Sequence, residues 1–190
     1  EQEDGSFVSH GLDVTTAYDV HFDPFDSTHV AISYTDIGYH HSYNQGKSWS
    51  RSTKGIPVEW QNTCYWIQFD PEVKDKLWSV WSNLHDFPRG KMTRNPKWTE
   101  YGKGGVAVST DGGRSWKPSI SGMDYDSPST SIVLDENSPA GKRTLYVAAY
   151  GKGVFKSVDD GKTWKLHNHG LEGSLAAFEL TIQPNGTLFL

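Results

Sequence analysis

The chain consists of short segments in which apolar and polar residues alternate, separated by turn-forming residues. Such alternation predicts β-strands. One kind of segment ends in an acid or a glutamine, followed by proline in three of its four copies, and lies at 19–24, 65–71, 131–135 and 179–184. A second kind, rich in β-forming residues, follows at 29–33, 77–81, 145–149 and 187–190. No part of the chain shows a convincing helical period.

An octet with the pattern S-x-D/N-x-G-x-x-W is the third recurring feature, and its copies lie at 42–49, 109–116 and 157–164. Asp or Asn followed two residues later by Gly is typical of a turn, because the short side chain caps backbone N–H groups and Gly accepts a positive φ. The final Trp buries a large ring beneath the turn. Each octet therefore predicts the tip of a β-hairpin, and Asn44, Asp111 and Asp159 are expected to be structural.

These segments combine into a repeat of four strands, whose first anchor recurs at positions 23, 70, 135 and 183. A four-stranded repeat of this length is typical of a β-propeller blade. We predict an all-β propeller of four-stranded antiparallel blades, with blade 1 at about 14–53, blade 2 at about 64–120, blade 3 at about 129–168 and the start of another at 178–190. Three blades and partial blades at both ends do not close a ring. We therefore expect the remainder of a longer chain, or other subunits, to complete a ring of about six to eight blades.

Composition narrows the classes of partner. The net charge of −5 argues against general nucleic-acid binding. Cys64 is the single cysteine, which excludes an intrachain disulfide and a cysteine metal cluster. No apolar run is long enough to cross a bilayer. The eight Trp suit a sheet protein or a sugar binder. His167 and His169 show no diagnostic metal-ligand spacing, so we expect no metal and no cofactor.

Propeller topology separates the loops into two sets. The turn between the first and second strands and the turn between the third and fourth strands, which is the octet, lie on one face of every blade. We call it the octet face. The connections between the second and third strands, and between blades, share the opposite loop face, where ligands usually bind. One such connection is extended: about twenty residues are inserted at 82–101, and long irregular loops are usually functional or disordered.

Candidate site residues gather on the predicted loop face. Asp36 is the only acid at its point in the three repeats, although a turn Asp that caps its loop is the alternative. Flat aromatic rings there are candidates to stack on pyranose faces, although each alone is more often packing. The candidates are Asp36 and Asp86 as catalytic carboxyl groups and Trp60, Trp81, His85, Arg89, Arg94, Trp98, Tyr125 and Tyr150 as substrate contacts.

The octets resemble Asp-box repeats, also called bacterial neuraminidase repeats. That family includes sialidases, xyloglucanases of glycoside hydrolase family 74 (GH74), sortilin-type receptors and photosystem assembly factors. The resemblance implies a propeller whose octets are remote from the active site. The segment 35–38, Thr-Asp-Ile-Gly, also resembles the xyloglucanase segment that carries one catalytic carboxylate, which implies that role for Asp36.

We therefore expect a secreted or periplasmic glycoside hydrolase that acts on an oligo- or polysaccharide of plants or microbes. Such enzymes use two carboxyl groups; Asp36 would be one, and Asp86 or an acid of a blade outside this chain the other. A non-catalytic binding or scaffold propeller is the alternative. A polysaccharide lyase, which would use His or Tyr as its base and Arg or Lys to neutralise a uronate, is a further alternative, because the basic inserted loop includes His85. A sialidase fits less well, because only Arg89 and Arg94 reach the loop face and the F/Y-R-I-P motif is missing.

Overall fold

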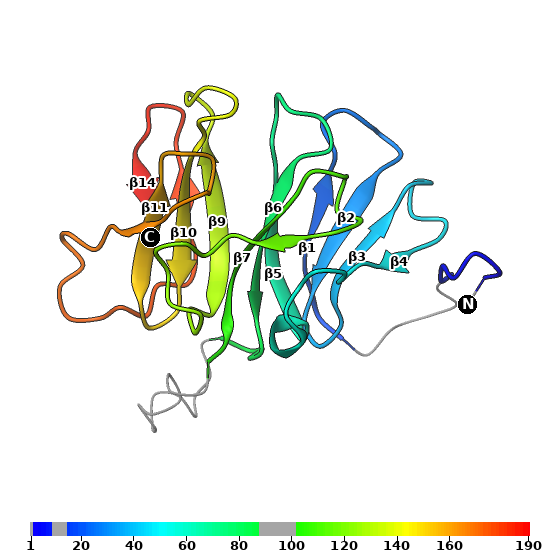
Figure 1. Cartoon of the computed structure of the whole chain (residues 1–190), viewed down its shortest axis with the longest axis horizontal. Coiled ribbons are helices and arrows are strands. Elements are labelled where there is room, and N and C mark those ends of the chain that lie inside the picture. The colour runs from blue at the N-terminus through cyan, green and yellow to red at the C-terminus, as the bar shows by residue number, and fades with distance from the viewer. Residues whose placement is uncertain (1, 9–14, 88–101) are drawn as a thin grey trace.

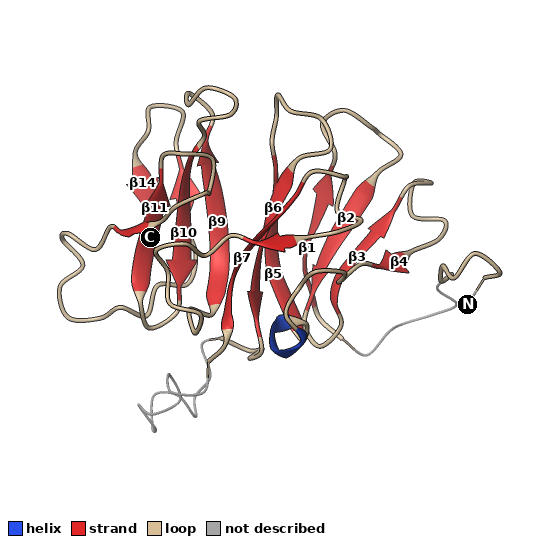
Figure 2. Cartoon of the chain, viewed as in Figure 1, coloured by secondary structure: helices blue, strands red, loops and turns tan. Residues whose placement is uncertain are grey.

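The computed structural model describes residues 2–8, 15–87 and 102–190. Their strands form three four-stranded antiparallel sheets and one two-stranded sheet (Figure 2). No α-helix occurs in these ranges, and the helical element found there is a single 3-10 turn, η1 (Val58–Trp60). The all-β prediction with four-stranded antiparallel blades is confirmed.

Each blade is one sheet whose strands pair in chain order. Blade 1 contains β1 (Ala17–Phe22), β2 (Val30–Tyr34), β3 (Gly38–Ser42) and β4 (Ser50–Arg51). Blade 2 contains β5 (Thr63–Phe69), β6 (Leu77–Ser82), β7 (Gly104–Ser109) and β8 (Lys117–Pro118). Blade 3 contains β9 (Ser129–Asp135), β10 (Thr144–Ala149), β11 (Gly153–Ser157) and β12 (Lys165–Leu166). The two-stranded sheet is β13 (Thr181–Ile182) with β14 (Leu188–Phe189).

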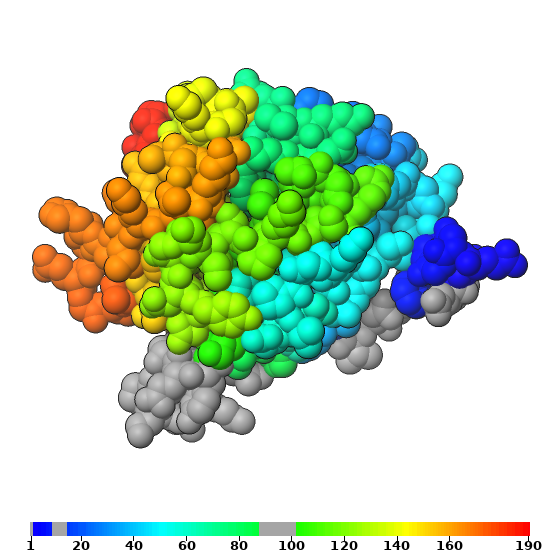
Figure 3. Space-filling model, in the orientation of Figure 1, coloured from blue at the N-terminus to red at the C-terminus, as the bar shows by residue number. Residues whose placement is uncertain are grey.

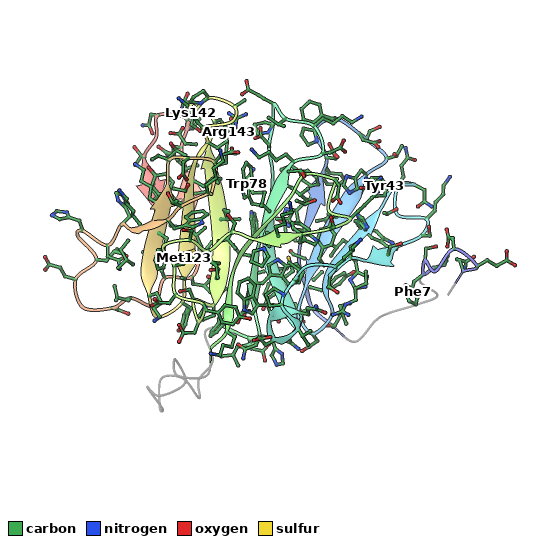
Figure 4. The ribbon with its side chains drawn as sticks, in the orientation of Figure 1. Phe7, Tyr43, Trp78, Met123, Lys142 and Arg143 are labelled. Carbon is green, nitrogen blue, oxygen red and sulfur yellow. The ribbon has the colours of Figure 1, made fainter. Side chains whose placement is uncertain are left out.

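The three blades lie side by side in chain order, from right to left in Figure 1. In the space-filling view they follow one another as closely packed bands of colour (Figure 3). Two apolar clusters fill the junctions. One contains Ala31, Tyr39 and Ile67 between blades 1 and 2. The other contains Val80 and Leu145, with Trp78 fully buried between blades 2 and 3 (Figure 4). The hydrophobic core is thus made where one sheet packs on the next.

Hydrogen bonds place the octets beside the first turn of their own blades. The tip amides of Gln45, Gly112 and Asp160 donate to the carbonyls of Thr28 (3.0 Å), Asp75 (2.9 Å) and Arg143 (3.0 Å), respectively. Those three acceptors lie in the connections from the first strand to the second, which form the upper edge in Figure 1. The octets and the first turns therefore share one face, as the repeat topology predicted.

All three first strands carry a β-bulge at the same place. In β1 the register with β2 shifts between Ala17 and Asp19, so that Tyr18 is the extra residue. Tyr65 takes that place in β5 and Thr130 in β9. A bulge bends the strand and re-aims its side chain. Here it redirects Tyr18 and Tyr65 toward the end of the blades opposite the octets.

Candidate functional site

Asp36, His85 and Asp86 meet on the loop face. Asp36 lies between β2 and β3 of blade 1, and the other two follow β6 of blade 2. Nδ1 of His85 lies 2.6 Å from Oδ1 of Asp36, and Nε2 lies 3.3 Å from Oδ2 of Asp86. The imidazole is therefore placed between two carboxylates from different blades. Their side chains are 48% and 55% exposed, which leaves both open to a ligand.

Both acids have a left-handed backbone, with φ of 61° at Asp36 and 59° at Asp86. Asp adopts this conformation more readily than most residues, because its short side chain bonds locally. The turns that present the two carboxylates are therefore compatible with Asp and Asn. A β-branched residue at either position would be strained.

Asn62 completes this cluster from the segment that precedes β5. Its amide Nδ2 lies 3.5 Å from Oδ1 of Asp36, and its Oδ1 lies 3.3 Å from Nδ1 of His85. The Thr63 hydroxyl donates to Oδ1 of Asn62 at 2.8 Å, and Thr63 is fully buried. Asn62 was not among the predicted site residues, because nothing in its spacing distinguishes it from an ordinary loop residue.

The two bulged tyrosines lie beneath the acids. Their rings stack with centroids 4.6 Å apart, joining blade 1 to blade 2. Burial raises the pKa of Tyr18, and the charges of Asp86 and Asp36 raise it further, against hydrogen bonds with Tyr65 and the Asp86 backbone. Burial also raises the pKa of Tyr65. Both phenols therefore stay neutral and act as hydrogen-bonding groups.

The Tyr65 hydroxyl fixes the start of the inserted loop. It donates to the Leu84 carbonyl at 3.1 Å and accepts from the Phe87 amide at 3.3 Å. The Phe87 ring then stacks on Tyr150 of blade 3 at 4.7 Å. His85 and Asp86 thus project from a short segment held at both ends by one buried side chain.

Three predicted substrate contacts are corrected by burial. Trp60 and Trp81 are 0% exposed and belong to the apolar cluster between blades 1 and 2, so neither ring can stack on a sugar. Trp81 donates from Nε1 to the Ser79 hydroxyl at 2.6 Å. Tyr150 is also buried, and its ring serves the packing of Phe87. The prediction of substrate contact is therefore wrong for these three residues, because packing between adjacent blades buries their rings.

Tyr125 remains accessible, with 42% of its surface exposed. Its hydroxyl donates to Glu59 at 2.9 Å, and its ring lies 5.3 Å from Trp60. It belongs to the connection between blades 2 and 3. Arg89, Arg94 and Trp98, also predicted as substrate contacts, lie outside the described residues.

The octets repeat one hydrogen-bond pattern. The Ser hydroxyl donates to the Asp or Asn side chain at 2.8, 2.7 and 2.8 Å in the three copies. Burial alone would raise the pKa values of Asp111 and Asp159, but hydrogen bonds from Ser115 and Thr163 outweigh it and lower them. The indole N–H groups of Trp116 and Trp164 donate to Ser52 (3.0 Å) and Ser119 (2.8 Å) of the preceding blade. The side chains of Asp111 and Asp159 therefore serve to hold the octet turns.

A buried ion pair on the octet face also joins two blades. Arg143 of blade 3, fully buried, bonds both carboxylate oxygens of Asp70 in blade 2, at 2.6 and 3.2 Å (Figure 4). It also bonds Glu72 at 2.7 Å. Burial acts to raise the pKa of Asp70, but the hydrogen bond with Arg143 outweighs it and lowers the pKa. This ion pair explains why an acid, Asp70, directly follows β5.

Within the described ranges, no three His, Cys, Asp or Glu side chains are grouped to hold a metal ion. Helices long and apolar enough to span a membrane are likewise absent from these ranges.

The profile of the BNR/Asp-box repeat matches residues 107–118, which include the second octet. The three four-stranded sheets and the hydrogen bonds repeated in the three octets together identify the fold. The chain has the Asp-box β-propeller fold. A comparison with curated protein sequences gave no match.

Solved propellers resemble the chain over nearly all its length. An ancestral GH74 enzyme aligns with a TM-score of 0.63 at 23% identity, covering 97% of this chain and 23% of its own. The GH74 enzyme of Niastella koreensis gives 0.57 at 13%, covering 90% and 25%. YCF48 bound to D1 peptide gives 0.56 at 15%, covering 92% and 47%. The chain thus spans about a quarter of the GH74 enzymes and under half of YCF48, and at these identities the likeness shows the fold alone.

Proposed function

We propose that the chain is a propeller segment of a glycoside hydrolase that acts on a polysaccharide, and that Asp36 supplies one catalytic carboxyl group. The observation that carries this proposal is the half-exposed Asp36 carboxylate on the loop face, held by side chains of the next blade. Function in repeat folds resides in such loops on a rigid scaffold. The likeness to GH74 propellers is consistent with it.

The second carboxyl group is assigned less directly. Asp86 lies beyond the His85 ring from Asp36, so an imidazole occupies the space between the two carboxylates. A glycosidase needs that space for the scissile bond and, when it inverts, for a water molecule, with carboxyl groups about 6.5–9.5 Å apart. Asp86 fits the role when His85 turns away. An acid from another blade of the ring fits without such movement.

Among the described residues that the sequence nominated for aromatic substrate contact, Tyr125 is exposed. With Trp60 and Trp81 in the core, we propose that Tyr125 offers the aromatic surface on which a sugar ring stacks. An extracellular or periplasmic location belongs to the same proposal, because polysaccharide substrates of this kind lie outside the cell.

A binding propeller without catalysis is the second candidate. The burial of three predicted sugar contacts favours it, since the described loop face is poorer in exposed aromatics than the sequence suggested. A polysaccharide lyase is less well supported. Its base must accept a proton from the substrate, whereas both ring nitrogens of His85 already face carboxylates.

Asp36→Asn tests the proposal. Asn keeps the left-handed turn and the volume of the side chain but has no ionisable group. We expect hydrolysis of β-glucans by the full-length protein to fall about 10²–10⁴-fold, with polysaccharide binding retained. Asp75→Asn is the matched control, because Asp75 has the same backbone conformation (φ 63°) on the octet face.

A panel of β-glucans and uronate polymers separates the candidates. Turnover that depends on Asp36 supports the hydrolase. Binding without turnover by the unmutated full-length protein supports the binding propeller and contradicts the catalytic role of Asp36.

A further inference from the structure

The contacts to the Asp36 carboxylate fall on one of its two oxygens. Nδ1 of His85 (2.6 Å) and Nδ2 of Asn62 (3.5 Å) both approach Oδ1. Among the described residues, no hydrogen bond or ion pair to Oδ2 is found. The two oxygens of the half-exposed side chain are therefore chemically different, because the next blade holds one of them.

The backbone under Asp36 is tied to the same neighbour. Arg51 of β4 donates from Nε to the Ile37 carbonyl at 2.9 Å and from Nη2 to the Gln61 carbonyl at 3.2 Å. One guanidinium thus bridges the turn that carries Asp36 and the segment that carries Asn62. The Asp36 turn is therefore held to the segment before β5 by the Arg51 guanidinium as well as by the Asp36 side chain.

His85 is itself presented by a fixed segment. The Leu84 amide donates to the Ser82 hydroxyl at 2.9 Å, and the Leu84 carbonyl accepts from the buried Tyr65 hydroxyl. At its far nitrogen the ring faces the Asp86 carboxylate. The Asp86 carboxylate at Nε2 thus helps to orient the ring so that Nδ1 faces Oδ1 of Asp36.

We propose that His85 is a positioning residue which, with Asn62, holds Oδ1 of Asp36 and leaves Oδ2 as the oxygen that meets the substrate. This inference rests on the proposed hydrolase function and deepens it. It also changes the role expected from the sequence, which placed His85 in contact with the substrate. The carboxylate of a hydrolase must be aligned closely with the reacting atoms, and a misplacement of about 1 Å costs up to about 100-fold in rate.

A positioning role predicts a particular split of the kinetic constants. In the full-length protein, His85→Ala should lower kcat for β-glucan hydrolysis about 10- to 100-fold and change KM by less than about twofold. His85→Gln should recover part of kcat, because its amide can donate one hydrogen bond to Oδ1. Asn62→Asp should lower kcat as well, since it replaces the donor facing Oδ1 with an acceptor. His169→Ala, an exposed histidine beyond β12, is the matched control and should leave both constants unchanged.

A raised KM with unchanged kcat in His85→Ala would make His85 a substrate-binding residue and overturn the inference. Equal loss in the Ala and Gln variants, together with a lowered unfolding midpoint, would reduce it to a structural residue. An unmutated protein without turnover contradicts the proposed function instead.

A spectroscopic measurement tests the geometry without turnover. The unmutated protein should show an exchange-protected Hδ1 resonance of His85 in its ¹H–¹⁵N spectrum. Asp36→Gly should weaken the protection and shift the resonance, because Gly keeps the positive φ, removes the carboxylate and leaves the Asn62 oxygen at 3.3 Å as the acceptor. An unchanged resonance with unchanged protection in that variant would show that the proton does not donate to Asp36 and would contradict the positioning role.

Discussion

The octet face and the loop face of the same three blades follow opposite rules. On the octet face, the amide of each tip Gly donates to the Ser hydroxyl at 2.9, 2.9 and 3.0 Å, so the copies are interchangeable. On the loop face, Asp36, Asn62 and His85 have no counterparts in the neighbouring blade. Repetition therefore marks groups that hold the fold, and departure from it marks the groups to which we assign the proposed chemistry.

The largest effect on stability is expected from Arg143 on the octet face. Arg143→Met removes the closest cation from the buried Asp70 and leaves Lys76, at 4.0 Å, as its remaining ion-pair partner, which costs up to about 3–5 kcal/mol of unfolding free energy. Urea unfolding measures it, and Arg114→Met, at an exposed arginine of the second octet, is the control. If both variants unfold at the same urea concentration, the buried pair does not hold blades 2 and 3 together.

Acid should destabilise the fold through two buried histidines of blade 1. Burial lowers the pKa values of His21 and His41 from 6.5 to about 4. Both are neutral in the folded chain and protonated in the unfolded chain between those values, so stability is complete above pH 6.5 and falls as the pH drops toward 4. Each shift contributes at most about 3 kcal/mol.

His41→Phe should flatten this pH dependence, because the substituted ring binds no proton. Unfolding free energies measured at several pH values in that window check it, with the exposed His167→Phe as the control. An unchanged pH slope in His41→Phe would show that His41 is not the titrating group.

The smallest effect is expected within a single octet. Asp159→Ala removes bonds to Ser157 and Thr163 and should cost about 1–2 kcal/mol. Asp159→Asn should cost less, because Asn44 fills this place in the first octet and donates to Ser48 at 2.8 Å. Thermal unfolding of the two variants measures the difference. A larger loss from Asn than from Ala would contradict the equivalence of the octets.

The fold was readable from the sequence because it repeats. The octets and anchors fixed the strand order, and the chain topology placed Asp36 and His85 on the same face. Their direct contact was not readable, because it depends on the packing of one blade on the next. The same packing buries Trp60 of η1 and Trp81 near the end of β6, where exposure was expected.

The bulges at Tyr18 and Tyr65 could not be predicted from the sequence, since a bulge interrupts the alternation at one residue and a strand this short carries too few residues to reveal it. Asn62 was missed for a related reason. Its contacts are with Thr63 and with Asp36 and His85, which are more than twenty positions away, so no local sequence pattern predicts them.

The division between the two faces is tested most directly by comparing Asp36→Asn with Asp75→Asn in one assay of β-glucan hydrolysis by the full-length protein. Both substitutions remove one carboxylate from a left-handed turn, on opposite faces. We expect loss of turnover in Asp36→Asn alone, with unfolding midpoints that match the unmutated protein. Retained turnover in Asp36→Asn, or equal loss in Asp75→Asn, would contradict the assignment of chemistry to the loop face.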